Sequence, residues 1–430
     1  MGFIIKIAQR LSLDRKGQAS SSNLIATTSV AISLFVVTIA IAITGGFKWE
    51  IREKISGYRG DIEICARYAD ITDWRTPIHS LSFGESAEEI ASISPVLYRN
   101  AILKGKSSIQ GVVIKGMGEG YDTTFFASHL TEGRMPAKGS DEILLSKRTA
   151  SLMNFSCGER INALFVNDGE SDADYLTNRR FTICGLYDAR IEEMDKLTAI
   201  ADGEIVRRVN GWDSTTLSGY EIRLKPLPYR EYLTRLEELS TDFERDGVAA
   251  FGSAVGNAAN DAASSAESDA TGLSALPINR TNDLLFNWLQ LLNINVVIIL
   301  ALMIAVASFN MISGMLIMLF EKMPQIGLLK SMGMSNFNIA RIFLSKAAGT
   351  MLIGMAAGGA AALLFCLLEQ RYRFIPLNAE SYFTDAVPIY ITPLQFIAVC
   401  LICFAAIMAA LAIPCHFIAK VSPAKSIKFN

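Results

Sequence analysis

Four long apolar runs divide the 430-residue chain, and each is long enough to cross a bilayer as a helix. A hydrocarbon core about 30 Å thick needs roughly 20 apolar residues of helix. The runs cover residues 24–44, 294–320, 342–368 and 394–414. The second is expected to start near residue 288, with an extension outside the hydrocarbon. The pattern therefore predicts an α-helical membrane protein with four transmembrane helices.

Between the first two runs, residues 45–287 show short alternating strands and a few helices instead. Alternation of apolar and polar residues predicts strands, whereas the helical period of about 3.6 predicts helices. The region is expected to be a large mixed α+β domain, with the second of two subdomains inserted in the first. The expected strands cover residues 61–66, 109–116, 142–146, 160–166, 181–186 and 220–224, and the expected helices cover 85–91, 146–153 and 229–239.

The stretch from residue 249 to 276 is rich in Ala, Ser, Gly, Asn and Asp and has almost no large apolar groups. Such a stretch cannot bury enough surface to offset its ordering entropy, which favours a flexible loop. An Ala-rich helix is the alternative, but Gly252 and Gly256 argue against it.

Lys and Arg gather in the segments expected to be cytoplasmic. Residues 1–23 contain four, residues 321–346 contain four and the tail after Pro414 contains three, against two in 369–392. By the positive-inside rule, both termini and the 321–341 segment face the cytoplasm, the 369–393 loop faces outward and 415–430 is a cytoplasmic tail. The first run lacks a clean cleavage site, so it is expected to be an uncleaved anchor rather than a signal peptide. Residues 1–23 carry an apolar helical stripe, which favours an interfacial helix over a disordered tail.

Residues that could support catalysis or metal binding are scattered. Gly105, Lys106 and Ser107 match the last three positions of a phosphate-binding loop motif. The motif also requires a glycine at position 100, where this chain has Asn100. His79, His129 and His416 lie far apart, and no cysteine pair has zinc-ligand spacing. No Asp or Glu falls within the four runs, which argues against a carrier driven by protons or sodium ions. We expect a transport subunit that is not an enzyme and binds no cofactor or metal of its own.

Two smaller features bear on packing. Asn310 is polar within the second run, so an interhelical hydrogen bond is its expected role. Gly354 and Gly358 form a GxxxG pair that suits close helix packing. Cys157 and Cys184 leave two interpretations open, a disulfide or buried free thiols.

Residues 305–343 resemble the most recognisable stretch of the FtsX-like permease family of ABC transporters. In that family the second span runs into a short cytoplasmic coupling helix that docks on the ATPase. The matching residues here are Glu321, Lys322, Ile326, Gly327, Leu328, Leu329, Lys330 and Gly333. Ile326, Leu328 and Leu329 are expected to press into a groove on the partner.

The segments 46–57, 133–158, 382–388 and 422–429 also look like the lipoprotein-releasing branch of that family, the LolC/LolE type. This resemblance implies a MacB-like periplasmic core domain and a multi-pass protein of the bacterial inner membrane. It also implies a LolD-like ATPase that binds ATP and magnesium, a second permease copy or paralogue, a lipoprotein substrate and a periplasmic carrier.

On this view the first two spans line a cavity open to the outer leaflet and to membrane lipid. The candidate lining residues are Phe35, Val36, Ile39, Ile43, Val306, Phe309 and Ile312; ordinary helix packing is the alternative for each. Three other functions stay open: a MacB-like export permease, an FtsX-like mechanotransmission subunit that regulates an extracytoplasmic partner, and a membrane-anchored receptor.

Overall fold

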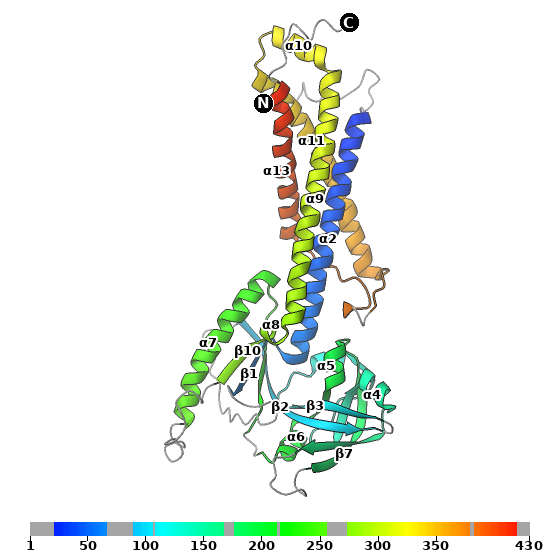
Figure 1. Ribbon diagram of the computed structural model, residues 1–430, viewed down its shortest axis with the longest axis vertical. Coiled ribbons are helices and arrows are strands. Elements are labelled where there is room, and N and C mark those ends of the chain that lie inside the picture. Colours follow the sequence, from blue (N-terminus) through cyan, green and yellow to red (C-terminus); the bar gives the residue numbers. More distant parts are fainter. Residues whose placement is uncertain are drawn as a thin grey trace. The chain divides into compact units, whose positions relative to one another are not determined.

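The computed structural model describes residues 21–66, 89–105, 108–166, 176–212, 216–255, 273–378 and 382–418 (Figure 1). The chain forms two compact units. We call the unit of residues 1–48, 287–377 and 386–430 the helical unit, and that of residues 49–286 and 378–385 the α+β unit. The predicted interfacial helix at 1–23 and the tail at 415–430 lie almost wholly outside the described residues.

Four helices in the described chain are long and apolar enough to cross a membrane: α2 (Ser21–Arg59), α9 (Asp283–Glu321), α11 (Asn336–Tyr372) and α13 (Pro393–Ile418). All four overrun the predicted spans, since an α-helix continues past the hydrocarbon wherever the flanking residues favour it. At 39 residues, α2 and α9 each extend about 58 Å, roughly twice the hydrocarbon thickness.

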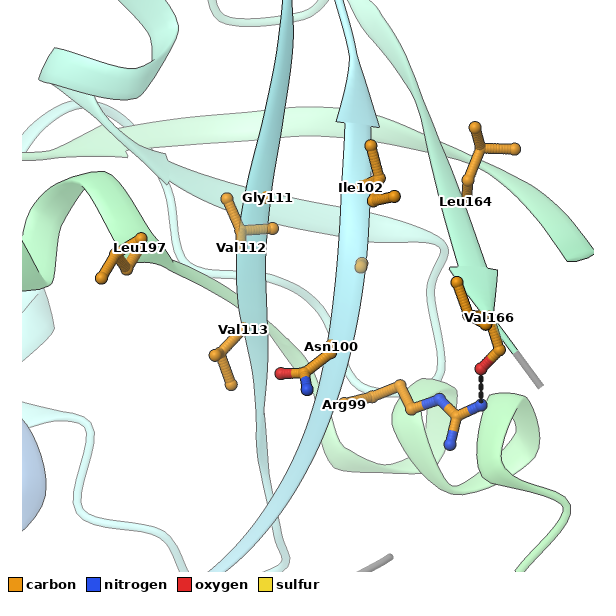
Figure 2. Close-up of a pocket in the computed structure, with 10 residues that line it drawn as sticks. Arg99, Asn100, Ile102, Gly111, Val112, Val113, Leu164, Val166 and Leu197 are labelled. Atoms are coloured by element: carbon orange, nitrogen blue, oxygen red, sulfur yellow. Dashed lines mark hydrogen bonds between the residues drawn. The ribbon is translucent and has the colours of Figure 1, made fainter. Parts of the chain in front are cut away.

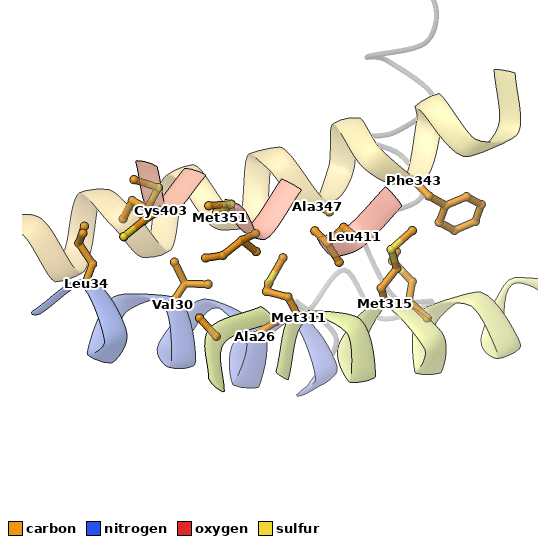
Figure 3. Packing of buried hydrophobic residues seen from close by; sticks show 14 of the residues in the cluster. Ala26, Val30, Leu34, Met311, Met315, Phe343, Ala347, Met351, Cys403 and Leu411 are labelled. Atoms are coloured by element: carbon orange, nitrogen blue, oxygen red, sulfur yellow. The ribbon is translucent and has the colours of Figure 1, made fainter. Parts of the chain in front are cut away.

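The helical unit has its own apolar core, to which all four long helices contribute (Figure 3). Val30 and Leu34 of α2, Met311 of α9, Met351 of α11 and Leu411 of α13 are all buried in it. Methionine is unbranched and fills irregular gaps between helices, which suits a core where four helices converge.

Two helix–helix contacts fix α2 within the bundle. A Cβ added to Gly354 would lie 2.7 Å from the Thr27 carbonyl oxygen, so α11 approaches α2 at backbone distance. Asn310 Nδ2 of α9 donates a hydrogen bond of 2.6 Å to Ser29 Oγ. Small residues and polar pairs hold membrane helices together where the hydrophobic effect between helices is weak.

The α+β unit is built on a ten-stranded sheet with the order β10-β1-β9-β2-β3-β8-β5-β7-β4, in which β6 pairs with β2 and β7. The β3–β8 and β5–β7 pairs are parallel and the other pairs are antiparallel. All the strands of the described residues belong to this one sheet. The strands are β1 (Ile62–Ala66), β2 (Ile90–Lys104), β3 (Ile109–Met117), β4 (Leu130–Gly133), β5 (Glu142–Ser146), β6 (Arg160–Val166), β7 (Leu176–Tyr187), β8 (Thr198–Asp202), β9 (Gly219–Leu224) and β10 (Leu273–Pro277).

The α+β unit also contains the helices α3 (Thr124–Ser128), α4 (Lys147–Met153), α5 (Glu192–Leu197), α6 (Gly203–Asn210), α7 (Tyr229–Val255) and α8 (Ile278–Thr281). Four membrane-length helices and a mixed α+β domain confirm the predicted fold class. Helix α4 starts where expected, because the Ser146 hydroxyl caps it by accepting a hydrogen bond of 3.1 Å from Thr149 N.

Two predictions about the α+β unit are wrong. The helix expected at 85–91 ends inside a strand, since Ile90 and Ala91 begin β2 and residues 85–88 lie outside the described chain. The loop expected at 249–276 is too long at both ends, because α7 continues to Val255 and β10 begins at Leu273. The glycine at 252 is thus tolerated inside a helix, and the rest of the loop prediction lies outside the described residues.

Candidate functional site: the coupling segment and the span surfaces

The segment that resembles a coupling helix forms a separate short helix, α10 (Met323–Ser331), between α9 and α11. Pro324 lies in its first turn, where a missing N–H costs no hydrogen bond. Gly333 follows the helix with a φ of +86°, a conformation that few other residues adopt. Ser335 then caps α11 by accepting a hydrogen bond from Asn338 N at 3.4 Å. Pro324, Gly333 and Ser335 therefore make α10 a separate helix between α9 and α11.

The structure corrects which residues of α10 are available to a partner. Ile326 is only 2% exposed and belongs to the core of the helical unit, together with Leu319, Ile339 and Phe343. Gly327 is buried as well. The prediction that Ile326 presses into a partner is therefore wrong, because the short helix folds one face onto its own bundle.

The outward face of the same segment carries other large apolar side chains. Leu328 is 63% exposed, Met332 is 77% exposed and Phe337 is 70% exposed. The Arg341 guanidinium lies 5.8 Å from the centre of the Phe337 ring. The sequence analysis singled out Leu328 but not the other two, because Met332 occupies a variable position of the family-like motif and Phe337 follows its last matching residue, Gly333. We call Leu328, Met332 and Phe337 the apolar coupling face.

The other coupling candidates lie around this face. Glu321 ends α9 and is exposed, whereas Lys322, Leu329 and Lys330 are half-buried. Exposed apolar residues with charges beside them are the usual composition of a protein-binding surface.

The seven candidate cavity residues do not form one surface in the single chain. Val306 and Phe309 of α9 are 44% and 72% exposed, and Ile312 packs against the bundle core. Phe35 of α2 is half-buried, and its ring centre lies 6.0 Å from that of Phe365 on α11. Val36, Ile39 and Ile43 are half-buried as well. Of the seven, only Val306 and Phe309 therefore belong to a face that the chain leaves uncovered.

A small cavity lies elsewhere in the bundle, between Val30, Val37, Met303, Met355 and Ile407. Its volume is about 10 Å³, roughly the space for one water molecule. It is far too small for an acyl chain.

A buried carboxylate lies next to the third predicted span, which itself contains no Asp or Glu. Glu369 lies just beyond the predicted third span but inside α11, with 0% of its surface exposed. Its Oε1 accepts a hydrogen bond of 3.3 Å from Ile375 N, and its Oε2 has no partner among the described residues.

The α+β unit carries an open, mostly apolar groove of about 560 Å³ on its sheet (Figure 2). Ile102, Val113 and Leu164 line it, and Gly111 contributes no side chain to the floor. The Arg99 guanidinium lies at one end and donates a hydrogen bond of 2.6 Å to the Val166 carbonyl oxygen.

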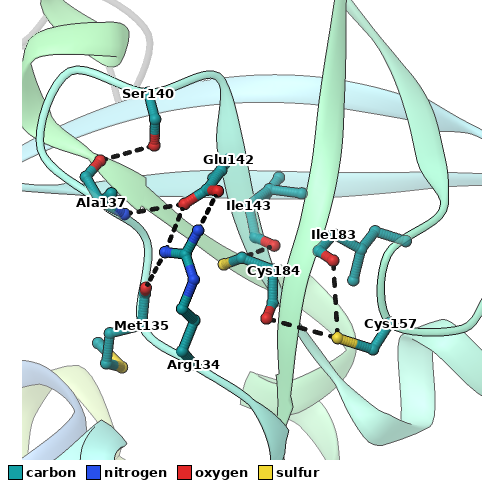
Figure 4. A network of polar contacts seen from close by, with 9 residues as sticks. All are labelled: Arg134, Met135, Ala137, Ser140, Glu142, Ile143, Cys157, Ile183 and Cys184. Carbon is teal, nitrogen blue, oxygen red and sulfur yellow. Dashed lines mark hydrogen bonds and ion pairs between the residues drawn. The ribbon is translucent and has the colours of Figure 1, made fainter.

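A polar cluster with two cysteines lies on the same unit (Figure 4). The Arg134 guanidinium binds both carboxylate oxygens of Glu142. Cys157 and Cys184 are both free thiols. Cys184 Sγ contacts the Ile143 carbonyl oxygen at 3.4 Å, whereas Cys157 Sγ contacts the Cys184 carbonyl oxygen at 3.4 Å. Of the two open interpretations, the structure favours free thiols. Burial raises the pKa of the Cys184 thiol to about 12, which makes it a poor nucleophile.

Deeper in the unit, Lys115 and Glu221 form an almost fully buried ion pair at 2.8 Å. Tyr98 and Tyr121 donate hydrogen bonds of 2.5 and 2.9 Å to the Glu221 carboxylate, so both of its oxygens are satisfied. Burial raises the pKa of the nearby Glu63 carboxyl to about 7; Glu221 adds to this shift, while Arg59 and Lys115 oppose it. Within the described residues, no group of three or more His, Cys, Asp or Glu side chains could hold a metal ion.

Comparison with known proteins shows two kinds of similarity, to a family model and to full-length relatives. Residues 297–423 match the family model of the FtsX-like permease C-terminal domain. The chain is 22% identical to the lipoprotein-releasing system transmembrane protein LolC of Xylella fastidiosa, with 97% of this chain and 96% of the relative aligned. It is 21% identical to LolC of Neisseria meningitidis serogroup B, with the same coverage.

Two solved structures are also similar. The periplasmic region of MacB from Actinobacillus actinomycetemcomitans has 12% identity and a TM-score of 0.30, covering 55% of this chain and 98% of that one. The extracellular domain of the ABC-type transporter YknZ has 9% identity and a TM-score of 0.28, covering 45% and 94%. The family model matches residues 297–423 and the LolC relatives align over almost the whole chain, so the chain is similar to permeases of the FtsX-like family, of the LolC/LolE type.

Proposed function

We propose that this chain is the permease subunit of an ABC transporter that extracts lipoproteins from the outer leaflet of the inner membrane and passes them to a periplasmic carrier. The similarity to LolC carries the proposal, because it spans almost the whole length of both proteins. A MacB-like export permease or an FtsX-like regulator of an outside partner fits that full-length similarity less well.

The arrangement in the membrane follows from the distribution of charge. With both termini and α10 in the cytoplasm, the Lys and Arg of the flanking segments obey the positive-inside rule. The α+β unit then faces the periplasm, where a soluble carrier can reach it.

A separate ATPase supplies the energy in this proposal. Removing an acyl chain from lipid costs roughly 0.8 kcal/mol per methylene, so a lipoprotein with several long chains does not leave the membrane spontaneously. The apolar coupling face on α10 and the start of α11 is the docking surface that we assign to this ATPase, with Lys322 and Lys330 beside it. ATP and magnesium bind to the ATPase rather than to this chain.

The uncovered face of α9 is the side that we assign to the substrate. Val306 and Phe309 present apolar surface to lipid or to a second permease copy. In a dimer, this face and the half-buried residues Phe35, Val36, Ile39 and Ile43 of α2 are positioned to line a cavity open to the outer leaflet, with Ile312 at its rear.

Depletion of the protein in its own bacterium tests the proposal. Mature lipoproteins that accumulate in the inner membrane, and return to the outer membrane on re-expression, support it. Normal lipoprotein sorting during depletion contradicts the substrate class. Altered sensitivity to exported compounds with normal sorting would favour the export permease instead.

A further inference from the structure

A short segment between α11 and α13 is held by two cationic side chains from distant parts of the sequence. Lys54 Nζ, near the end of α2, donates a hydrogen bond to the Phe383 carbonyl oxygen. Arg190, just after β7, forms an ion pair with Asp385. All four residues belong to the α+β unit, although Phe383 and Asp385 lie in the connection between two membrane helices. Because the two charge-assisted contacts are made at Phe383 and Asp385, two residues apart, they fix both the position and the orientation of this segment.

Two backbone conformations in this joint are unusual. Phe383 has a φ of +61° and Arg190 has a φ of +62°. Residues other than glycine rarely adopt this left-handed region, because the Cβ clashes with the following carbonyl. Such conformations persist where the surrounding contacts hold them, and they concentrate at functional positions.

The continuation of the same segment is anchored in the helical unit. Tyr390 N donates a hydrogen bond of 3.0 Å to the Ala42 carbonyl oxygen of α2. A Cβ added to Gly46 would lie 2.0 Å from the Pro388 carbonyl oxygen, so only glycine allows this approach. The segment leads directly into α13, which begins at Pro393. We call residues 382–390 the strap.

We propose that the strap transmits movement between α13 and the α+β unit, as a further mechanical connection beside the continuous helices α2 and α9. Lys54 and Arg190 are positioning residues in this proposal, because they hold the strap and touch no substrate. The proposal rests on the proposed function, in which ATP-driven movement of the spans must reach the outward domain. Without the two cations, α13 moves while the strap slips on the α+β unit.

A charge-reversal cycle tests the strap in the full chain, assembled with its ATPase in lipid nanodiscs. The variants are Arg190→Glu, Asp385→Arg and the two combined. Lys138→Glu is the matched control, since it reverses one partner of an exposed ion pair, with Glu119, on the same unit. The first readout is the nucleotide-dependent change in hydrogen exchange of the α+β unit, and the second is acylated protein released per ATP hydrolysed.

Each single reversal places like charges opposite each other, and we expect about a fivefold loss in both readouts. The combined variant restores both, and Lys138→Glu changes neither. If a charge-reversal variant does not fold, Gly46→Ala replaces it as the test. This change displaces the strap at Pro388 without altering any charge, and we expect it to lower both readouts as well. Full nucleotide-dependent exchange in both single variants, or no restoration in the combined one, overturns the strap. If the wild type shows the nucleotide-dependent change in hydrogen exchange but releases no acylated protein, the proposed function is wrong. The strap proposal is still supported in that case, provided that the reversal variants lose the exchange change.

Discussion

Gly358 of α11 lies so close to Ala31 of α2 that a Cβ on the glycine would sit 2.2 Å from the Ala31 carbonyl oxygen. No real Cβ tolerates that distance, and the neighbour is backbone, which cannot move aside as a flexible side chain can. The first and third membrane helices therefore approach each other at backbone distance here, as they do at Gly354.

Replacing Gly358 with alanine is therefore expected to force the two helices apart and lower the stability of the bundle. Gly349 offers a control in the same helix, because a Cβ there meets nothing within 4 Å. Gly349→Ala should raise stability by about 0.5–1 kcal/mol, as alanine favours the helix over glycine. Thermal unfolding of the two purified variants in detergent gives the comparison. A Gly358→Ala protein as stable as wild type contradicts the close approach.

The sequence predicted the membrane helices well because their signal is long and strong. It could not predict where each helix ends, since the polar residues of Glu50 to Arg59 and the interspersed polar residues of Asp283 to Asn293 interrupt the apolar pattern, although both segments form helix. Strand β2 was missed for a different reason. Besides its sequence neighbour β3, β2 pairs with β6 and β9, which lie far away in the sequence, and the local residue pattern does not show such long-range pairing.

For the coupling residues too, the local sequence predicted the position of a helix but not which of its side chains are buried. The motif located α10 correctly, but its spacing could not say which apolar face turns toward the bundle. Burial of Ile326 is decided by Ile339 and Phe343 on the next helix. The strap escaped prediction altogether, because Lys54, Arg190 and Asp385 are separated by more than a hundred residues from one another.

The apolar coupling face gives a prediction that separates docking from folding. Leu328→Asp places a charge on an exposed position, so we expect a folded permease that no longer co-purifies with the ATPase. Ile326→Ala, in contrast, removes buried side-chain volume and should cost about 2–5 kcal/mol of stability, while any protein that still folds keeps the ATPase. Ser151→Asp adds the same charge to an exposed position on α4 of the α+β unit and should have no effect on co-purification. Retention of the ATPase by Leu328→Asp would refute the assignment.

The buried Lys115–Glu221 pair predicts a strongly non-additive effect. Lys115→Met leaves the Glu221 carboxylate buried without its cation, and breaking such a pair typically costs about 3–5 kcal/mol. Lys115→Met combined with Glu221→Gln removes both charges, so it should be considerably more stable than the single variant. Chemical unfolding followed through the α+β unit measures the cycle. Equal stability of the single and combined variants would show that the two charges are not coupled.

Glu63 predicts how the stability of the α+β unit depends on pH. Burial raises the pKa of its carboxyl to about 7 in the folded chain, above its ordinary value, so the folded state holds the proton more tightly than the unfolded state. This contribution to stability is fully present at low pH and is lost as the pH rises toward 7. Glu63→Gln imitates the protonated form. We therefore expect it to match wild type at pH 4.5 and to unfold at a higher temperature at pH 8. A difference that is the same at both pH values would contradict the shifted pKa.

The uncovered face of α9 gives the most direct test of where the substrate lies. A photoreactive amino acid at Phe309 should crosslink to an acylated protein when the permease is reconstituted with its ATPase, and addition of ATP should reduce the crosslink as the substrate leaves. Ile353 on α11 is a matched control, since it is apolar and 66% exposed but lies on a different helix. Its photoreactive variant should label lipid and show no ATP dependence with acylated protein. Equal labelling of acylated protein from both positions would mean that the substrate only shares the bilayer with the permease and has no assigned side on α9.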